Sequence, residues 1–180
     1  MKKNIFNILN KVRSMLINKS VDVVAKDGSA FEFVNRVRYN EDLNEESISG
    51  LIDPLIKKKD AAAIFNFLHS ATNIGVKDID KLTDAIIEFE KAIFIYNFAL
   101  DEKLSTENLD KLTDAIIKTE ELAFIYCFAR DIKGLSKENL RDLQLAINRL
   151  SVKEGSSNLS SFNNSEKFKD GEQLVRSRKK

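Results

Sequence analysis

The sequence predicts an all-α protein, built as an α-solenoid of about four two-helix repeats, and three observations support this prediction. The string DKLTDAII occurs at residues 80–87 and again at residues 110–117, an offset of 30. Residue types that cap helix N-termini recur in the same register. The 180 residues also include only one proline and six glycines, as expected of a mainly helical chain.

The repeat extends beyond this string. The apolar segment at residues 94–101 recurs at residues 124–131 with six of eight positions identical. At an offset of 31, weaker copies of the amphipathic segment begin at Ile48 and at Leu140. One repeat of 30–31 residues therefore contains an amphipathic segment followed by an almost wholly apolar one. We expect each segment to form a helix, and stacked copies to share one continuous core.

Four helix starts have the same local chemistry. The register places Asn44, Gly75, Ser105 and Ser136 at one equivalent position, directly before each amphipathic segment. A short side-chain oxygen, or the freedom of glycine, compensates for the unpaired amide groups at a helix start. We therefore expect a helix to begin after each of these residues.

The second segment of the repeat is apolar nearly all round at residues 92–100. Such a segment is typical of a helix buried between neighbours. Phe65, Tyr96 and Tyr126 recur in this register, and we expect them to lie in the core, with an aromatic groove as the alternative interpretation. Neither glycine nor proline separates Ile117 from Phe124. Whether the two helices of a repeat are separate or merge into one is therefore left open.

The chain divides into four segments by composition. Residues 1–20 are predicted to form a basic amphipathic helix, with Ile5, Ile8, Leu9, Val12 and Leu16 at helical spacing. Residues 21–30 form a connection or a short hairpin, residues 31–150 the helical repeat domain, and residues 151–180 a flexible basic tail rich in Ser and Asn.

Charge is distributed unevenly along the chain. The formal net charge is +1, yet residues 21–150 carry 17 basic and 24 acidic residues, whereas residues 1–20 carry five basic residues and no acidic one. Cys127 is the only cysteine, so no intramolecular disulfide can form. With no disulfide to indicate an oxidising compartment, we expect the reducing cytoplasm by default. No stretch approaches the ~20 apolar residues of a membrane span.

Aspartates recur in the register of the repeat. Asp53, Asp84 and Asp114 form a ladder, and Asp80–Asp84 and Asp110–Asp114 are pairs of like charge four residues apart on one helix face. Such a pair destabilises an isolated helix by a few tenths of a kcal/mol, so its presence in two copies points to a use. These five aspartates are the predicted partner-binding residues, and a merely solvated acidic face is the alternative interpretation.

No combination of residues predicts catalysis, a cofactor or a metal site. His69 is the only histidine, and neither a cysteine pair nor a glycine-rich phosphate loop is present in the sequence. An enzyme site needs convergent polar groups with matched roles. We therefore expect a protein that is not an enzyme. Lys2, Lys3, Lys11 and Arg13 are the candidate contacts to nucleic acid or to an anionic membrane.

The pattern DKLTDAII followed by AFIYCFARDIKG resembles the short tandem helical repeats found in proteins of AT-rich bacteria and their phages. In architecture it is similar to HEAT-like and tetratricopeptide solenoids, although the tetratricopeptide Trp and its 34-residue period are not matched. The resemblance covers about residues 31–150. It implies a protein-binding scaffold and carries over no catalytic residue.

Three functional hypotheses follow. The first is a protein-binding helical repeat module whose acidic surface engages another protein, with self-association left open. The second is a phage-type inhibitor that blocks a bacterial defence nuclease by presenting acidic residues in place of nucleic acid. The third is binding of nucleic acid or an anionic membrane through the basic termini, with an affinity that falls steeply as salt rises.

Overall fold

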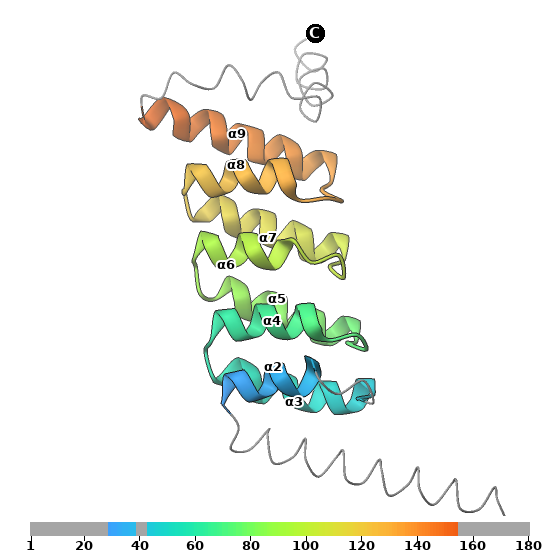
Figure 1. The fold of residues 1–180 in the computed structure, drawn as a ribbon. Coiled ribbons are helices and arrows are strands. Elements are labelled where there is room, and N and C mark those ends of the chain that lie inside the picture. The colour runs from blue at the N-terminus through green and yellow to red at the C-terminus, as the bar shows by residue number, and fades with distance from the viewer. Residues whose placement is uncertain (1–28, 39–42, 155–180) are drawn as a thin grey trace, which may run out of the picture. The chain divides into compact units, whose positions relative to one another are not determined.

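A computed structural model of the chain describes residues 29–38 and 43–154, which form eight α-helices (Figure 1). These are α2 (Ala30–Arg38), α3 (Glu45–Lys57), α4 (Ala61–Ser70), α5 (Val76–Ile87), α6 (Ala92–Ala99), α7 (Thr106–Lys118), α8 (Leu122–Asp131) and α9 (Lys137–Glu154). No β-strand occurs among the described residues. The prediction of an all-α protein is confirmed for this part of the chain.

Several predictions lie outside the described residues. These are the basic helix at residues 1–20 with Lys2, Lys3, Lys11 and Arg13, most of the connection at 21–30, and the tail from residue 155 onward. Helix α2 begins at Ala30, and α9 continues to Glu154, beyond the boundary placed at residue 150.

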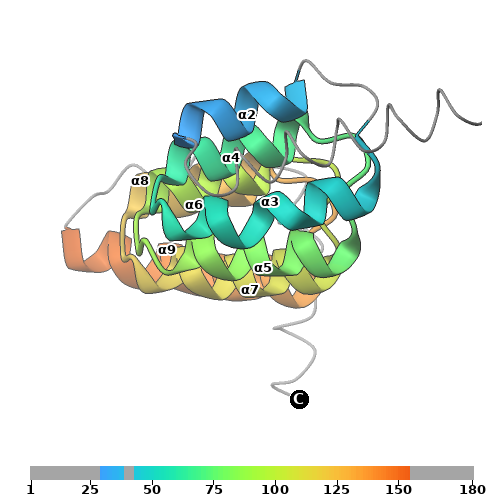
Figure 2. The same ribbon diagram turned by 90° about the horizontal axis from the view of Figure 1, so that it is seen from below.

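The described residues divide into two compact units, one that ends at Ile86 and one that begins at Ile87. In the first unit, α2 packs against α3 and α4, and α3 packs against α4. Helix α5 is tied to α3 by the Ser49 hydroxyl, which donates a hydrogen bond to the Asp78 carboxylate at 3.3 Å. In the second unit, α6 lies beside α8, and both α6 and α9 pack against α7 and α8 (Figure 2).

Each unit has its own apolar core, formed by the buried faces of its helices. In the second unit, Leu112 and Ile116 of α7 are fully buried and lie four residues apart, as the amphipathic pattern requires. Phe98 of α6 and Phe128 of α8 contribute the largest buried side chains. In the first unit the largest buried side chains include Phe33, Leu51, Ile52, Ile64 and Phe67.

All four predicted helix starts are confirmed. Helices α3, α5, α7 and α9 begin directly after Asn44, Gly75, Ser105 and Ser136. The side-chain oxygens of Asn44, Ser105 and Ser136 accept the backbone N–H three residues ahead at 2.9, 3.1 and 3.0 Å. Each oxygen thus pairs one of the amide groups that a helix start leaves without an intrahelical partner.

The turns that follow the amphipathic helices answer the question of merged helices. Helix α7 ends at Lys118 and α8 begins at Leu122, so these two helices are separate. Lys59, Glu90 and Glu120 occupy equivalent positions in the three turns and have left-handed φ angles of 51°, 51° and 53°. Helices commonly end with a left-handed residue, but glycine or asparagine normally occupies that position. The sequence therefore carries no recognisable stop signal here.

The left-handed turn gives a stability prediction at Lys59, which is exposed and directly follows the C-cap of α3. We expect Lys59→Gly to raise the free energy of unfolding by about 0.5–1 kcal/mol, because relief of the Cβ clash outweighs the added entropy of the unfolded chain. Lys59→Val should lower it by at least about 1 kcal/mol, since a β-branched residue is least tolerated at positive φ.

Urea unfolding followed by circular dichroism measures both changes. Lys57→Gly is the matched control, because Lys57 is the last residue of α3 and glycine inside a helix costs about 1 kcal/mol. If both glycine variants destabilised the chain equally, a strained turn at Lys59 would be ruled out.

Candidate protein-binding surface

The five aspartates predicted to bind a partner are distributed over both units. Asp53 on α3 and Asp80 and Asp84 on α5 belong to the first unit, and Asp110 and Asp114 on α7 belong to the second. Asp84 and Asp114 are exposed, whereas Asp80 is half-buried.

Asp53 and Asp110 make contacts inside their own unit. Asp53 pairs with the Lys81 ammonium at 2.9 Å, and this hydrogen bond raises the pKa of Lys81. Asp110 accepts a hydrogen bond from the Asn139 amide of α9 at 2.7 Å. Because Asn139 is only 7% exposed, Asp110 supplies a buried donor with its partner. Part of the recurrence of aspartate thus has a structural cause.

The structural role of Asp110 can be tested by comparison with Asp114. We expect Asp110→Ala to lower the free energy of unfolding by about 1–3 kcal/mol, since the Asn139 amide loses its acceptor. Asp114→Ala is the matched control: it lies on the same helix and receives the same gain in helix propensity, and its effect should stay within about 0.5 kcal/mol. Equal effects in thermal or urea unfolding would contradict a structural role for Asp110.

The residue 28 positions after Asp114 differs in charge from the residue 28 positions after Asp53. Asp53 and Lys81 are 28 residues apart, and the same spacing from Asp114 leads to Asp142 on α9. Asp142 pairs with its neighbour Arg141 at 3.1 Å. At this spacing an acidic residue of α9 therefore stands where the first unit has a lysine.

The outer side of α6 and α8 forms a second surface, which we call the aromatic face. It consists of Ile93, Tyr96, Asn97 and Leu100 from α6 and its C-cap, with Tyr126 and Cys127 from α8. Ile93 is 42% exposed and Leu100 is 47% exposed, and the other four residues are half-buried. Helix α6 contains no charged residue at all.

These observations correct two predictions. Residues 92–100 do not form a helix buried on all sides, because Ile93 and Leu100 face solvent. Tyr96 and Tyr126 are half-buried and lie at the border of the core. An uncharged helix sequence cannot distinguish the two situations, because the exposed positions carry the same apolar residue types as the buried ones.

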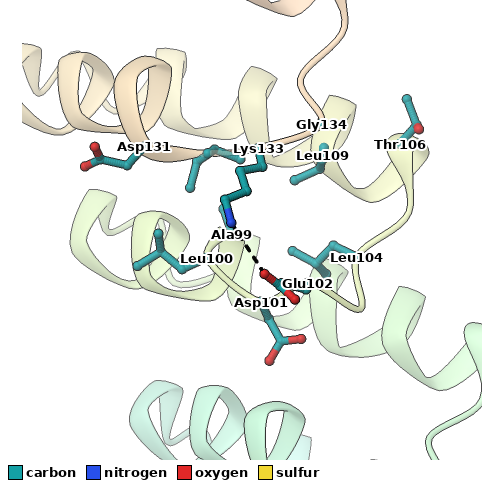
Figure 3. A pocket seen from close by; sticks show the side chains of 11 residues that line it. Ala99, Leu100, Asp101, Glu102, Leu104, Thr106, Leu109, Asp131, Lys133 and Gly134 are labelled. Atoms are coloured by element: carbon teal, nitrogen blue, oxygen red, sulfur yellow. Dashed lines mark ion pairs between the residues drawn. The ribbon is translucent and has the colours of Figure 1, made fainter.

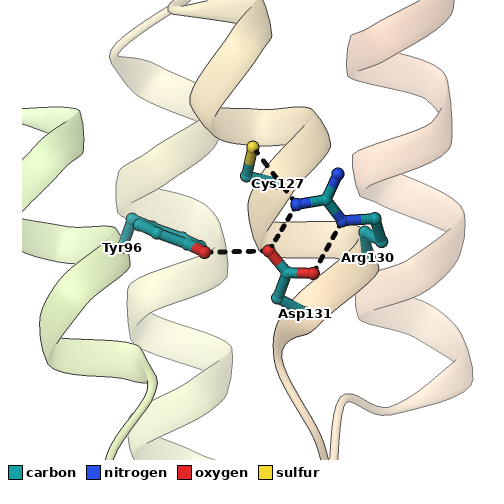
Figure 4. Close-up of polar contacts among 4 residues, drawn as sticks. All are labelled: Tyr96, Cys127, Arg130 and Asp131. Carbon is teal, nitrogen blue, oxygen red and sulfur yellow. Dashed lines mark hydrogen bonds and ion pairs between the residues drawn. The ribbon is translucent and has the colours of Figure 1, made fainter.

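Polar contacts at the C-terminal end of α8 hold the aromatic face in place (Figure 4). The Tyr96 hydroxyl donates to Asp131 at 2.8 Å and so joins α6 to α8. Arg130 contacts both oxygens of the same carboxylate, at 2.7 and 2.9 Å, and its guanidinium lies 5.7 Å from the centre of the Tyr126 ring. The hydrogen bond to Asp131 raises the pKa of Tyr96, and the paired carboxylate raises that of Arg130.

A ring contact adds to this link between the two helices. The rings of Tyr96 and Phe124 lie 6.2 Å apart, within the range of favourable aromatic pairs. Arg130 also reaches the Cys127 sulfur at 3.9 Å. The aromatic face is thus a surface whose side chains are positioned before any partner binds.

The described residues, 29–38 and 43–154, also bear on metal sites and membrane spans. No group of three or more His, Cys, Asp or Glu side chains in these residues is arranged to hold a metal ion. None of their helices is both long and apolar enough to cross a membrane.

Comparison of the chain with protein-family models, with curated proteins and with solved structures found no match.

Proposed function

We propose that the chain is a non-enzymatic α-solenoid of about four two-helix repeats that binds another protein. The solenoid is supported by the 30–31-residue sequence period and by the recurrence of equivalent helix starts and left-handed turns in both units. Packing of α6 against α8 and of α7 against α9 within the second unit is the neighbour contact that stacked repeats require.

The observation that carries the binding function is the composition of the aromatic face. Ile93 and Leu100 are exposed, and the half-buried Tyr96 and Tyr126 lie near them on α6 and α8. Interface cores are enriched in aromatic residues and depleted in charge. A contiguous apolar surface on a folded chain commonly marks a site of protein contact.

The acidic residues have a second role in this proposal. Asp84 and Asp114 are exposed on α5 and α7, and residues 21–150 have an excess of seven acidic residues. Such a surface attracts a partner with a basic patch and increases its association rate more than its final affinity. Asp53 and Asp110 also have structural roles, since Asp53 pairs with Lys81 and Asp110 accepts a hydrogen bond from Asn139.

Capture experiments test the proposal. The tagged full chain and an Ile93→Asp variant are incubated with a lysate of the organism that encodes the chain, with and without nuclease. We expect a discrete protein to be retained by the wild-type chain after nuclease treatment and to be lost with the variant. Recovery that requires intact nucleic acid would instead assign the function to the basic termini.

A further inference from the structure

A cavity of about 460 Å³ opens in the second unit between the turn after α6 and the turn after α8 (Figure 3). Its apolar lining comes mainly from Leu100, Leu104, Leu109 and Ile132. Cavities of about 300–1,000 Å³ with a mostly apolar wall and a few polar groups are typical of ligand sites. The cavity is therefore large enough to enclose an aliphatic side chain of another molecule.

The polar part of the lining is mainly acidic. Asp101, Glu102 and Asp131 contribute three carboxylates, and Lys133 contributes the one ammonium group. Asp101 and Asp131 are already paired, with Lys103 at 3.5 Å and with Arg130 at 2.7 Å. Glu102 pairs with Lys133 at the surface of the cavity, and because both side chains are exposed it is the carboxylate most open to a partner.

The Glu102–Lys133 pair can be exchanged at little cost. Its two charged groups lie 3.6 Å apart, and both side chains are 87% exposed. Ion pairs at such exposure contribute little to stability, because water screens them and two long side chains must be held in place. A cation from another molecule can therefore replace Lys133 beside Glu102 without a large loss of stability.

The cavity is continuous with the aromatic face. Leu100 belongs to both, and Asp131 of the cavity wall accepts the hydrogen bond from Tyr96. Asn97 lies one helical turn before Leu100, and among the described residues its half-buried side chain has no hydrogen-bond partner. An amide in this state offers a donor and an acceptor to the main chain of a bound segment.

We propose that this cavity anchors one aliphatic side chain of the bound protein, and that a basic residue adjacent in the bound segment pairs with Glu102. The occupant is thus a segment of a partner protein in which leucine or isoleucine stands next to arginine or lysine. This inference rests on the proposed protein-binding function and specifies the chemistry of the partner at one end of the aromatic face.

Short peptides on the full-length chain provide the test. The probe is acetyl-Gly-Leu-Arg-Gly-amide, titrated into ¹⁵N-labelled protein while amide shifts of Leu104, Thr106 and Gly134 are followed by NMR. We expect saturable shifts with a millimolar dissociation constant, as suits so small a ligand. Replacing the peptide leucine by serine should weaken binding about tenfold or more, because the buried apolar area is lost. Replacing the arginine by glutamate should weaken it about fivefold.

A charge reversal in the protein completes the design. Glu102→Lys should weaken binding of the arginine peptide about fivefold, whereas Glu88→Lys, an exposed acidic residue outside the cavity, should change it less than about twofold. Shifts that are absent, or that are equal for all three peptides, would overturn the proposal. So would equal affinity of the wild type and Glu102→Lys.

The test separates this inference from the proposed function. Loss of the captured protein with Ile93→Asp, together with no peptide binding, would leave protein binding intact and remove the cavity as an anchor. Peptide binding without any captured protein would leave the anchor and count against the protein-binding module.

Discussion

Replacing Phe98 by alanine is expected to lower the free energy of unfolding by about 3–5 kcal/mol, the usual cost of removing a fully buried phenylalanine ring. Phe98 has no exposed surface and comes from α6, which packs against α7 and α8. The loss includes the transfer of the ring to water and the cavity that its neighbours cannot fill. Because small domains are stable by only about 5–15 kcal/mol, much of the stability of the second unit depends on this residue.

Urea unfolding followed by circular dichroism measures this change. Phe31→Ala is the control, since Phe31 is 70% exposed on α2 and its removal should change stability by less than about 0.5 kcal/mol. If both variants lowered the free energy of unfolding by a similar amount, Phe98 would not be a core residue.

Ile93→Asp is expected to weaken binding of the captured protein at least about tenfold, because it places a charge where the interface would exclude water. The side chain is already 42% exposed, so the fold should tolerate the change and stability should fall by less than about 1 kcal/mol. Titration calorimetry with the purified partner measures the affinity, and thermal unfolding verifies that the variant remains folded.

A matched control distinguishes the aromatic face from exposed apolar surface in general. Leu145 on α9 is 56% exposed, and Leu145→Asp makes the same kind of change outside the aromatic face. We expect its affinity to remain within about twofold of the wild type. If both variants lost binding equally, the partner would not be held by the aromatic face in particular.

Local chemistry explains why much of the helical structure could be predicted. The caps Asn44, Ser105 and Ser136 need only their own backbone three residues ahead, so short sequence signals define these helix starts. The buried Leu112 and Ile116 follow from helical periodicity alone. By contrast, the left-handed Lys59 and Glu120 are long charged residues whose sequence gives no sign of a helix end.

The candidate site could be predicted only in part. That Asp110 binds Asn139 depends on the packing of α9 against α7, which no single helix pattern contains. The repeat did contain a signal for this contact. Ser49–Asp78 and Asp110–Asn139 are both separated by 29 residues, so the two polar pairs join equivalent helices at equivalent positions. The exposure of Ile93 and Leu100 could not be predicted from the sequence, because α6 carries no charged residue that would distinguish its solvent side from its core side.

Site-specific photo-crosslinking tests most directly whether the chain binds a protein through the aromatic face. A photoreactive phenylalanine is placed at Asn97 in one full-length variant and at Leu145 in another, and each is irradiated in a nuclease-treated lysate. We expect a discrete protein adduct from position 97 and none from position 145. Adducts of equal yield from both positions, or an adduct from position 145 alone, would contradict it.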